Sequence, residues 1–189
     1  MINVRNPRDK ALTPILRFLT QYKIAPNMVS IAGIISMVLF GIATYLHIYY
    51  VSIIFLTLSV LADLLDGSLA RFQHASTEAG KKFDLIADGI TFTVFMIAIG
   101  LAHLLSLVVA IIIIILQIIL TVKSTNKAIA STAHTGVQLH EVQGFWIAIS
   151  LVKAIMYVSF IIEIFSSTTA VPIMRLIAIF ILAFGIIKR

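Results

Sequence analysis

The sequence has no cysteine and little charge. The absence of cysteine excludes disulfides, zinc–thiolate sites and thiol catalysis, which leaves carboxylates and histidines as the available metal ligands. Charged residues make up only 12% of the 189 residues, whereas hydrophobic residues make up 60% and the mean hydropathy is +1.09. A soluble domain of this length could not bury so much apolar surface. The composition therefore excludes an ordinary soluble globule and predicts one integral membrane domain.

Apolar runs close to the roughly 20 residues needed to cross a bilayer recur along the chain. We therefore expect an all-α membrane protein with six transmembrane helices separated by polar or aromatic breaks. Residues 1–26 interleave basic and apolar residues at helical spacing, which predicts an N-terminal amphipathic helix lying along the membrane surface, ahead of a transmembrane domain over residues 27–189. The expected spans are residues 28–48, 50–72, 81–102, 104–123, 144–166 and 168–187.

Basic residues gather on one side of these six spans. Alternating the sides places the N-terminal segment, the loops at 73–80 and 123–143 and the C-terminus together, and the Lys and Arg residues of the loops lie there. By the positive-inside rule, that side is cytoplasmic. The net charge of +6 indicates topology and affinity for anionic membrane lipids, and no stripe typical of nucleic-acid binding is present in the sequence. We expect no nucleic-acid partner.

Four aspartates lie inside the second and third expected spans, at Asp63, Asp66, Asp84 and Asp88. Helical spacing lets two antiparallel helices point all four carboxylates at one volume near the cytoplasmic side. Carboxylates at membrane depth need a compensating cation, and oxygen ligands suit Mg²⁺ or Mn²⁺, with more than two carboxylates suggesting two ions. A proton relay or a polar network that pairs the helices fits the residues equally well.

A transporter is the alternative class of function, since an ion or proton transporter would also use intramembrane aspartates. A transport path needs polar residues that reach both faces of the membrane, and the far halves of these spans have few.

These aspartates stand in a fixed pattern with small and basic residues. The string from Asp63 to Asp88 matches D-x2-D-G-x2-A-R-x8-G-x3-D-x3-D at all eight fixed positions over 26 residues. The chain thereby resembles the CDP-alcohol phosphotransferases, integral membrane enzymes of phospholipid synthesis. A weaker likeness is Pro26-Asn27 with Ser30, similar to the P-N-x-x-[ST] string of many members, for which a helix cap by Asn27 or Ser30 is the alternative reading.

The resemblance implies transfer of a substituted phosphate, phosphatidyl or archaetidyl, from a CDP-linked lipid donor to an acceptor hydroxyl, with release of CMP. It also implies a homodimer and two Mg²⁺ or Mn²⁺ ions held by the four aspartates, with Asp88 acting as the general base. The residues implied to line the CDP site are Gly67, Ala70, Arg71, Gly80, Asn27 and Ser30.

The acceptor has no matching signature, because the chain lacks both the G-K-x-K-T-like and the E-R-x-E-R-like strings of better-defined members. Lys123 and Lys127 are one helical turn apart, and Lys153 lies inside the fifth expected span. Together they would hold a small anionic acceptor such as glycerol phosphate or inositol phosphate. The alternatives are topological charge for the first pair and snorkelling for Lys153. Arg175, in the sixth expected span, has no assigned role.

Overall fold

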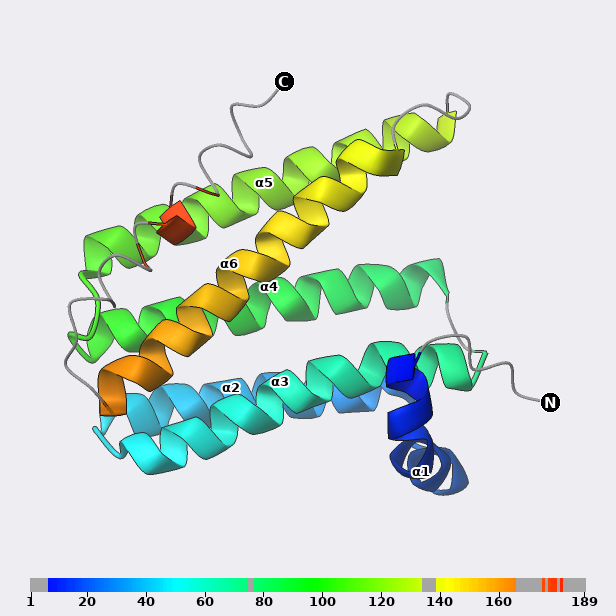
Figure 1. The fold of residues 1–189 in the computed structure, drawn as a ribbon, viewed down its shortest axis with the longest axis horizontal. Helices are drawn as coiled ribbons and strands as arrows, with labels where there is room; N and C mark the ends of the chain where they lie inside the picture. Colours follow the sequence, from blue (N-terminus) through cyan, green and yellow to red (C-terminus); the bar gives the residue numbers. More distant parts are fainter. Residues whose placement is uncertain are drawn as a thin grey trace. The chain divides into compact units, whose positions relative to one another are not determined.

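The computed structural model is helical, and it describes residues 7–74, 77–133, 139–165, 175, 177–179 and 181. The chain forms two compact units, Met1–Leu104 and Leu105–Arg189, and each is described by itself (Figure 1). The first unit contains α1 (Pro7–Gln21), α2 (Pro26–Tyr45), α3 (Tyr49–Phe72) and α4 (Glu78–Leu101), and the second contains α5 (Leu107–Ala133) and α6 (Leu139–Phe165).

In the first unit, α2 packs against both α3 and α4, which contact each other little. A small residue brings α2 close to α3, because a Cβ atom added at Gly33 would lie only 3.0 Å from the Cβ of Ala62. On the other side, Phe40 of α2 stacks on Phe95 of α4 with the ring centroids 5.3 Å apart. Close approach through small residues is the usual packing of helices in lipid. The position of α2 therefore determines where α3 and α4 lie.

Among the residues that the structure describes, three helices are long and apolar enough to cross a membrane, namely α2, α3 and the Phe83–Leu101 part of α4, and Leu107–Lys123 forms a shorter apolar helix within α5. Many of their large apolar side chains are exposed, as lipid-facing residues would be. These segments agree with the first four expected spans to within a few residues. The full set of six spans and the interfacial role of α1 stay predictions, and most of the sixth expected span lies outside the described residues.

The loop expected over residues 123–143 is wrong for most of its length. Helix α5 continues to Ala133, and α6 already begins at Leu139. The polar residues after Lys123 are compatible with a helix in water, since Lys, Ser, Asn and Ala differ by well under 1 kcal/mol per residue in helix propensity. Polarity in this stretch marks the end of the apolar part of the helix, and the helix itself ends later.

Four helices of the first unit end at residues in the left-handed conformation that are not glycine. Lys23, His47, His74 and His103 have φ between 52° and 59°. At the end of α4, the His103 N–H donates to the carbonyl of Gly100 and the next N–H, of Leu104, reaches back to Ile99. This pair of hydrogen bonds defines the Schellman motif, in which glycine is the usual left-handed residue. The three histidines thus have a structural place at helix ends.

In the second unit, α5 and α6 pack against each other over fully buried apolar residues that include Ile113 and Phe160. The buried polar side chains of this unit include Gln117 on α5 and Lys153 and Ser159 on α6. Arg175, which had no assigned role, forms an ion pair with Glu163 of α6. A carboxylate beside a buried guanidinium lowers the cost of both charges in an apolar setting.

Candidate metal and nucleotide site

Carboxylates from α3 and α4 come together in the first unit. One oxygen from each of Asp63, Asp66 and Asp84 lies within 4.8 Å of the others. Two ionised carboxylates at that distance repel by about 1 kcal/mol at the permittivity of water and by about 3.5 kcal/mol at an effective permittivity of about 20. A divalent cation removes this repulsion, and Mg²⁺ and Mn²⁺ prefer carboxylate oxygens. The donor set therefore fits the metal that the sequence predicts.

Asp66 is the buried member of this group, with 5% of its surface exposed, whereas Asp63 and Asp84 are exposed. Its two oxygens accept separate hydrogen bonds, one from the Ser30 hydroxyl of α2 at 2.5 Å and one from the Gly67 backbone N–H at 2.6 Å. A carboxylate held on both oxygens has a defined orientation, as metal ligands usually do. The fourth predicted aspartate, Asp88, lies one turn after Asp84 on α4, is partly buried, and is not a member of the close group of three.

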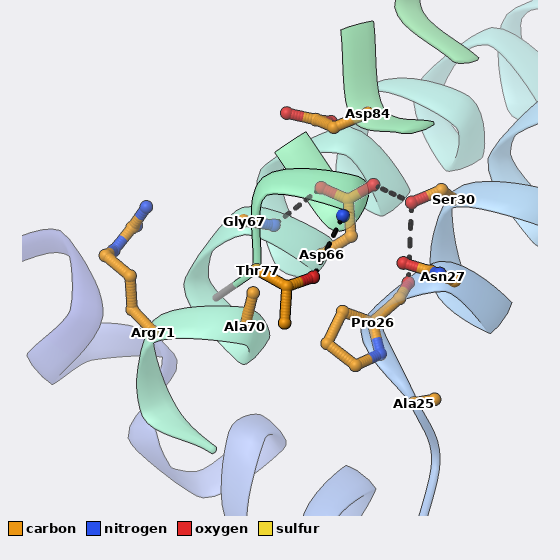
Figure 2. A pocket seen from close by; sticks show the side chains of 11 residues that line it. Ala25, Pro26, Asn27, Ser30, Asp66, Gly67, Ala70, Arg71, Thr77 and Asp84 are labelled. Carbon is orange, nitrogen blue, oxygen red and sulfur yellow. Dashed lines mark hydrogen bonds between the residues drawn. The ribbon is translucent and has the colours of Figure 1, made fainter. Parts of the chain in front are cut away.

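A pocket of about 390 Å³ opens beside Asp66 and Asp84, within the range of about 300–1,000 Å³ typical of small-molecule sites. Figure 2 shows Arg71 on one side of it and Asn27 and Ser30 on the other, with Asp66 between them. All six residues predicted to contact CDP line this pocket; Asp63 and Asp88 do not. The complete lining consists of Ala25, Pro26, Asn27, Ser30, Asp66, Gly67, Ala70, Arg71, Thr77, Gly80 and Asp84.

The start of α4 borders the pocket through a residue that the sequence analysis missed. Thr77 is the N-cap of α4, and its hydroxyl oxygen accepts the Gly80 N–H at 3.0 Å (Figure 2). A Cβ atom at Gly80 would lie only 3.2 Å from that oxygen, so glycine gives the cap its room. The signal was available in the sequence, because Thr is a favoured N-cap residue and Thr77 stands shortly before the third expected span.

Arg71 lines the opposite side of the pocket. Its Nη2 donates to the Ser68 hydroxyl at 3.1 Å, and a Cβ atom at Gly67 would lie 3.6 Å from its Nη1. The guanidinium therefore lies next to Gly67, where the absence of a side chain leaves the pocket open. A guanidinium at the mouth of a pocket is suited to binding phosphate through paired N–H donors.

The alternative reading of Asn27 and Ser30 as helix caps is wrong. The N-cap of α2 is Ala25, Pro26 stands in the first turn, and no side-chain cap hydrogen bond is made there by the described residues. Ser30 lies inside the helix, so its hydroxyl is directed at Asp66 of α3 as well as at its own helix, 3.4 Å from the Pro26 carbonyl. Proline supplies the helix start without a side-chain cap, which frees Ser30 for a contact between helices.

The three lysines predicted to bind the acceptor belong to the second unit. Lys123 on α5 is partly buried and Lys153 on α6 is 8% exposed. The side chain of Lys127 lies outside the described residues. Their convergence on the aspartates stays a prediction.

Comparison with known proteins places this site in a family. Residues 23–187 match the family model of the CDP-alcohol phosphatidyltransferases. A protein of Aquifex aeolicus (strain VF5), described as an uncharacterized protein, is 29% identical over 95 residues, which are 50% of this chain and 48% of that protein. The chain thus aligns with about half the length of that relative. Because the family match covers most of its length, the chain belongs to the CDP-alcohol phosphatidyltransferase family, whose members are integral membrane transferases of substituted phosphate groups.

Proposed function

We propose that the chain transfers a phosphatidyl or archaetidyl group from a CDP-linked lipid donor to the hydroxyl of an acceptor and releases CMP. The observation that carries the proposal is the position of the Asp63, Asp66 and Asp84 group beside a pocket lined by every residue predicted for the CDP site. A protein that only paired its helices through polar residues would have no use for a pocket at the same place.

The three grouped aspartates would hold one or two Mg²⁺ or Mn²⁺ ions, with Asp88 contributing to the second. When bound, these ions would neutralise the pyrophosphate of the donor and the charge that develops on the CMP leaving group. Arg71 would bind donor phosphate at the pocket mouth, and Gly67, Ala70 and Gly80 would leave room for the nucleotide along the backbone. Asn27 would meet the nucleotide from α2.

Asp88 would act as the general base. The acceptor oxygen forms the new bond to phosphorus, the bond from phosphorus to the CMP oxygen breaks, and the acceptor proton passes to the Asp88 carboxylate. Asp88 lies one turn after Asp84 on α4 and is not among the residues that line the nucleotide pocket, which supports a role toward the second substrate. Transfer then needs the two substrates to meet between Asp84 and Asp88.

The acceptor in this proposal is a small phosphorylated polyol such as glycerol phosphate or inositol phosphate, held by Lys123, Lys127 and Lys153. We assign them this role because lysine ammonium groups bind phosphate through charge-assisted hydrogen bonds, and Lys153 on α6 is 8% exposed. The distribution of basic loops supports an active site and two termini that face the cytoplasm. The homodimer is proposed from the family resemblance.

The test is release of CMP by the purified protein. Vesicles or micelles containing CDP-diacylglycerol, or its ether-lipid counterpart, would be incubated with a panel of phosphorylated and phosphate-free alcohols in Mg²⁺, Mn²⁺ or EDTA. We expect metal-dependent CMP release, loss of turnover and of donor binding in Asp66→Asn, and loss of turnover with donor binding retained in Asp88→Asn.

Glu163→Gln is the control for loss of a carboxylate as such, because it removes one from α6, where it pairs with Arg175; assayed below its unfolding temperature, it should keep CMP release. Full CMP release by Asp88→Asn would contradict its role as the base. Aspartate-dependent ion flux into vesicles, with no CMP released from any donor, would favour the transporter instead.

A further inference from the structure

One ligand of the proposed metal site is held by a helix outside the signature that carries the aspartates. The Ser30 hydroxyl of α2 donates to Asp66 of α3 across 36 positions of sequence, and both side chains are buried, at 6% and 5% exposure. The hydroxyl has one proton, and Asp66 at 2.5 Å is a closer acceptor than the Pro26 carbonyl at 3.4 Å. The bond to the carboxylate is therefore the one that the hydroxyl makes.

The same two helices also come close together one turn from this hydrogen bond. Gly33 follows Ser30 by three residues and Ala62 precedes Asp66 by four, so both pairs lie on the facing sides of α2 and α3. A Cβ atom at Gly33 would come within 3.0 Å of the Ala62 Cβ and 3.6 Å of the Ser59 carbonyl oxygen. A side chain at position 33 would be tighter than an ordinary van der Waals contact, so we expect α2 and α3 to move apart by a few tenths of an ångström and the contact between Ser30 and Asp66 to lengthen.

We propose that α2 sets the position of the metal ligand Asp66, with Ser30 as a positioning residue and the Gly33–Ala62 contact as the spacing that lets Ser30 reach it. This inference rests on the proposed function, because it assigns the hydroxyl a task only if Asp66 binds metal. The Ser30 bond occupies one lone pair of one carboxylate oxygen and restrains the plane of the carboxylate. The Gly67 N–H occupies a lone pair of the other oxygen, which leaves lone pairs on both oxygens for a metal ion.

Two observations support a role in orientation beyond packing. Asp66 also accepts the Gly67 N–H on its other oxygen, so the two bonds together remove rotation about the last side-chain bond. Asp66 is also the buried member of the group, with 5% of its surface exposed, whereas Asp63 and Asp84 are exposed. Partners that orient metal ligands are typically worth about tenfold to a hundredfold in metal affinity.

The inference is tested by measuring Mn²⁺ affinity directly, by electron paramagnetic resonance of the full chain in detergent, without a turnover assay. We expect Ser30→Ala to raise the Mn²⁺ dissociation constant about tenfold or more, and Ser30→Thr, which keeps a hydroxyl, to stay within about threefold of the wild type. Ser36→Ala is the matched control, since that hydroxyl bonds to the Ala32 carbonyl of its own helix and should leave Mn²⁺ affinity unchanged.

The spacing is tested independently of the hydroxyl. Gly33→Ala should weaken Mn²⁺ binding, and adding Ala62→Gly should restore it, because the second change removes the atom that the new Cβ would meet. Gly41→Ala is the control on the same helix, where a Cβ would make ordinary contacts at 3.6 Å with Ala98 and Val94. Circular dichroism of the metal-free variants reports folding, and a purely structural role would lower thermal stability while leaving the dissociation constant unchanged.

The outcomes separate this inference from the proposed function. Mn²⁺ binding that stays at the wild-type affinity in Asp66→Asn would overturn both the positioning role and the proposed metal site. Binding that is lost in Asp66→Asn and normal in Ser30→Ala would overturn the positioning role and leave the metal site standing. Failure of Ala62→Gly to restore affinity to the Gly33→Ala protein would overturn the part assigned to the helix contact.

Discussion

Neutralising one of the three grouped aspartates should change the stability of the protein in opposite directions with and without metal. We consider Asp84→Asn, because Asp84 is exposed and its oxygen lies within 4.8 Å of oxygens from both Asp63 and Asp66. Each such pair of charges repels by about 1 kcal/mol at the permittivity of water, and more where Asp66 is buried. Removing the Asp84 charge relieves two pairs, so the metal-free variant should be about 1–2 kcal/mol more stable than the wild type.

Bound metal should reverse the order of stability of the wild type and Asp84→Asn. A cation that binds the folded state at 100 times its dissociation constant adds about 2.7 kcal/mol to the free energy of unfolding. The wild type should gain that amount in Mg²⁺, while the variant, which lacks one ligand, gains little. The wild type should then be the more stable protein by about 1 kcal/mol, a shift of about 2–4 °C in the unfolding temperature for a chain of this length.

The assay is thermal unfolding in detergent, followed by circular dichroism, in EDTA, in Mg²⁺, and in NaCl at the ionic strength of the Mg²⁺ sample. NaCl screens the repulsion without providing a bound ion, so it should reduce the difference in unfolding temperature between Asp84→Asn and the wild type without making the wild type the more stable protein. Glu163→Gln is a control of opposite sign, because that carboxylate is paired with Arg175 and its loss should destabilise the protein in every buffer. A variant that is less stable than the wild type in EDTA, or that gains as much from Mg²⁺, would refute the reasoning.

Two further predictions concern a buried cation and a helix end. Lys153→Met should raise the acceptor KM at least about tenfold, equivalent to about 1.4 kcal/mol, and leave donor affinity nearly unchanged, as measured by steady-state CMP release; a phosphate-free alcohol as the best acceptor would contradict this. His103→Gly should raise the free energy of unfolding by about 0.5–1 kcal/mol because its φ of 59° suits glycine, whereas His103→Ala, which keeps the Cβ, should give no such gain in the same melting assay.

The spacing of the aspartates predicted their meeting well. Positions 63 and 66 share one face of α3, and the position of Asp84 on the next antiparallel helix follows from the short connection, so three of the four carboxylates meet as helical periodicity requires. The residues predicted to line the nucleotide pocket also do so, because they belong to the same two helix faces and to the start of α2. Local periodicity suffices where a site lies on consecutive elements.

What periodicity left open depends on which helix packs on which. The contact of Gly33 with Ala62, and with it the bond from Ser30 to Asp66, follows from the packing of α2 on α3, which no spacing within either helix reveals. The loop expected after Lys123 was misplaced because hydropathy reports the end of the apolar layer, while α5 runs on to Ala133. The pairing of Arg175 with Glu163 was missed because it depends on how two separate segments pack, which the spacing within either segment does not reveal.

The order of the helices along the chain has a consequence for how this membrane protein is made. Helix α2 is synthesised before α3, so when the segment with Asp63 and Asp66 reaches the membrane, a helix that offers a hydroxyl donor and a small-residue surface is already there. A helix that carries two carboxylates inserts poorly alone, and a neighbour that pairs with one of them lowers that cost. Grafting the 26-residue signature onto another helical hairpin would therefore transfer the aspartates without the helix that receives them.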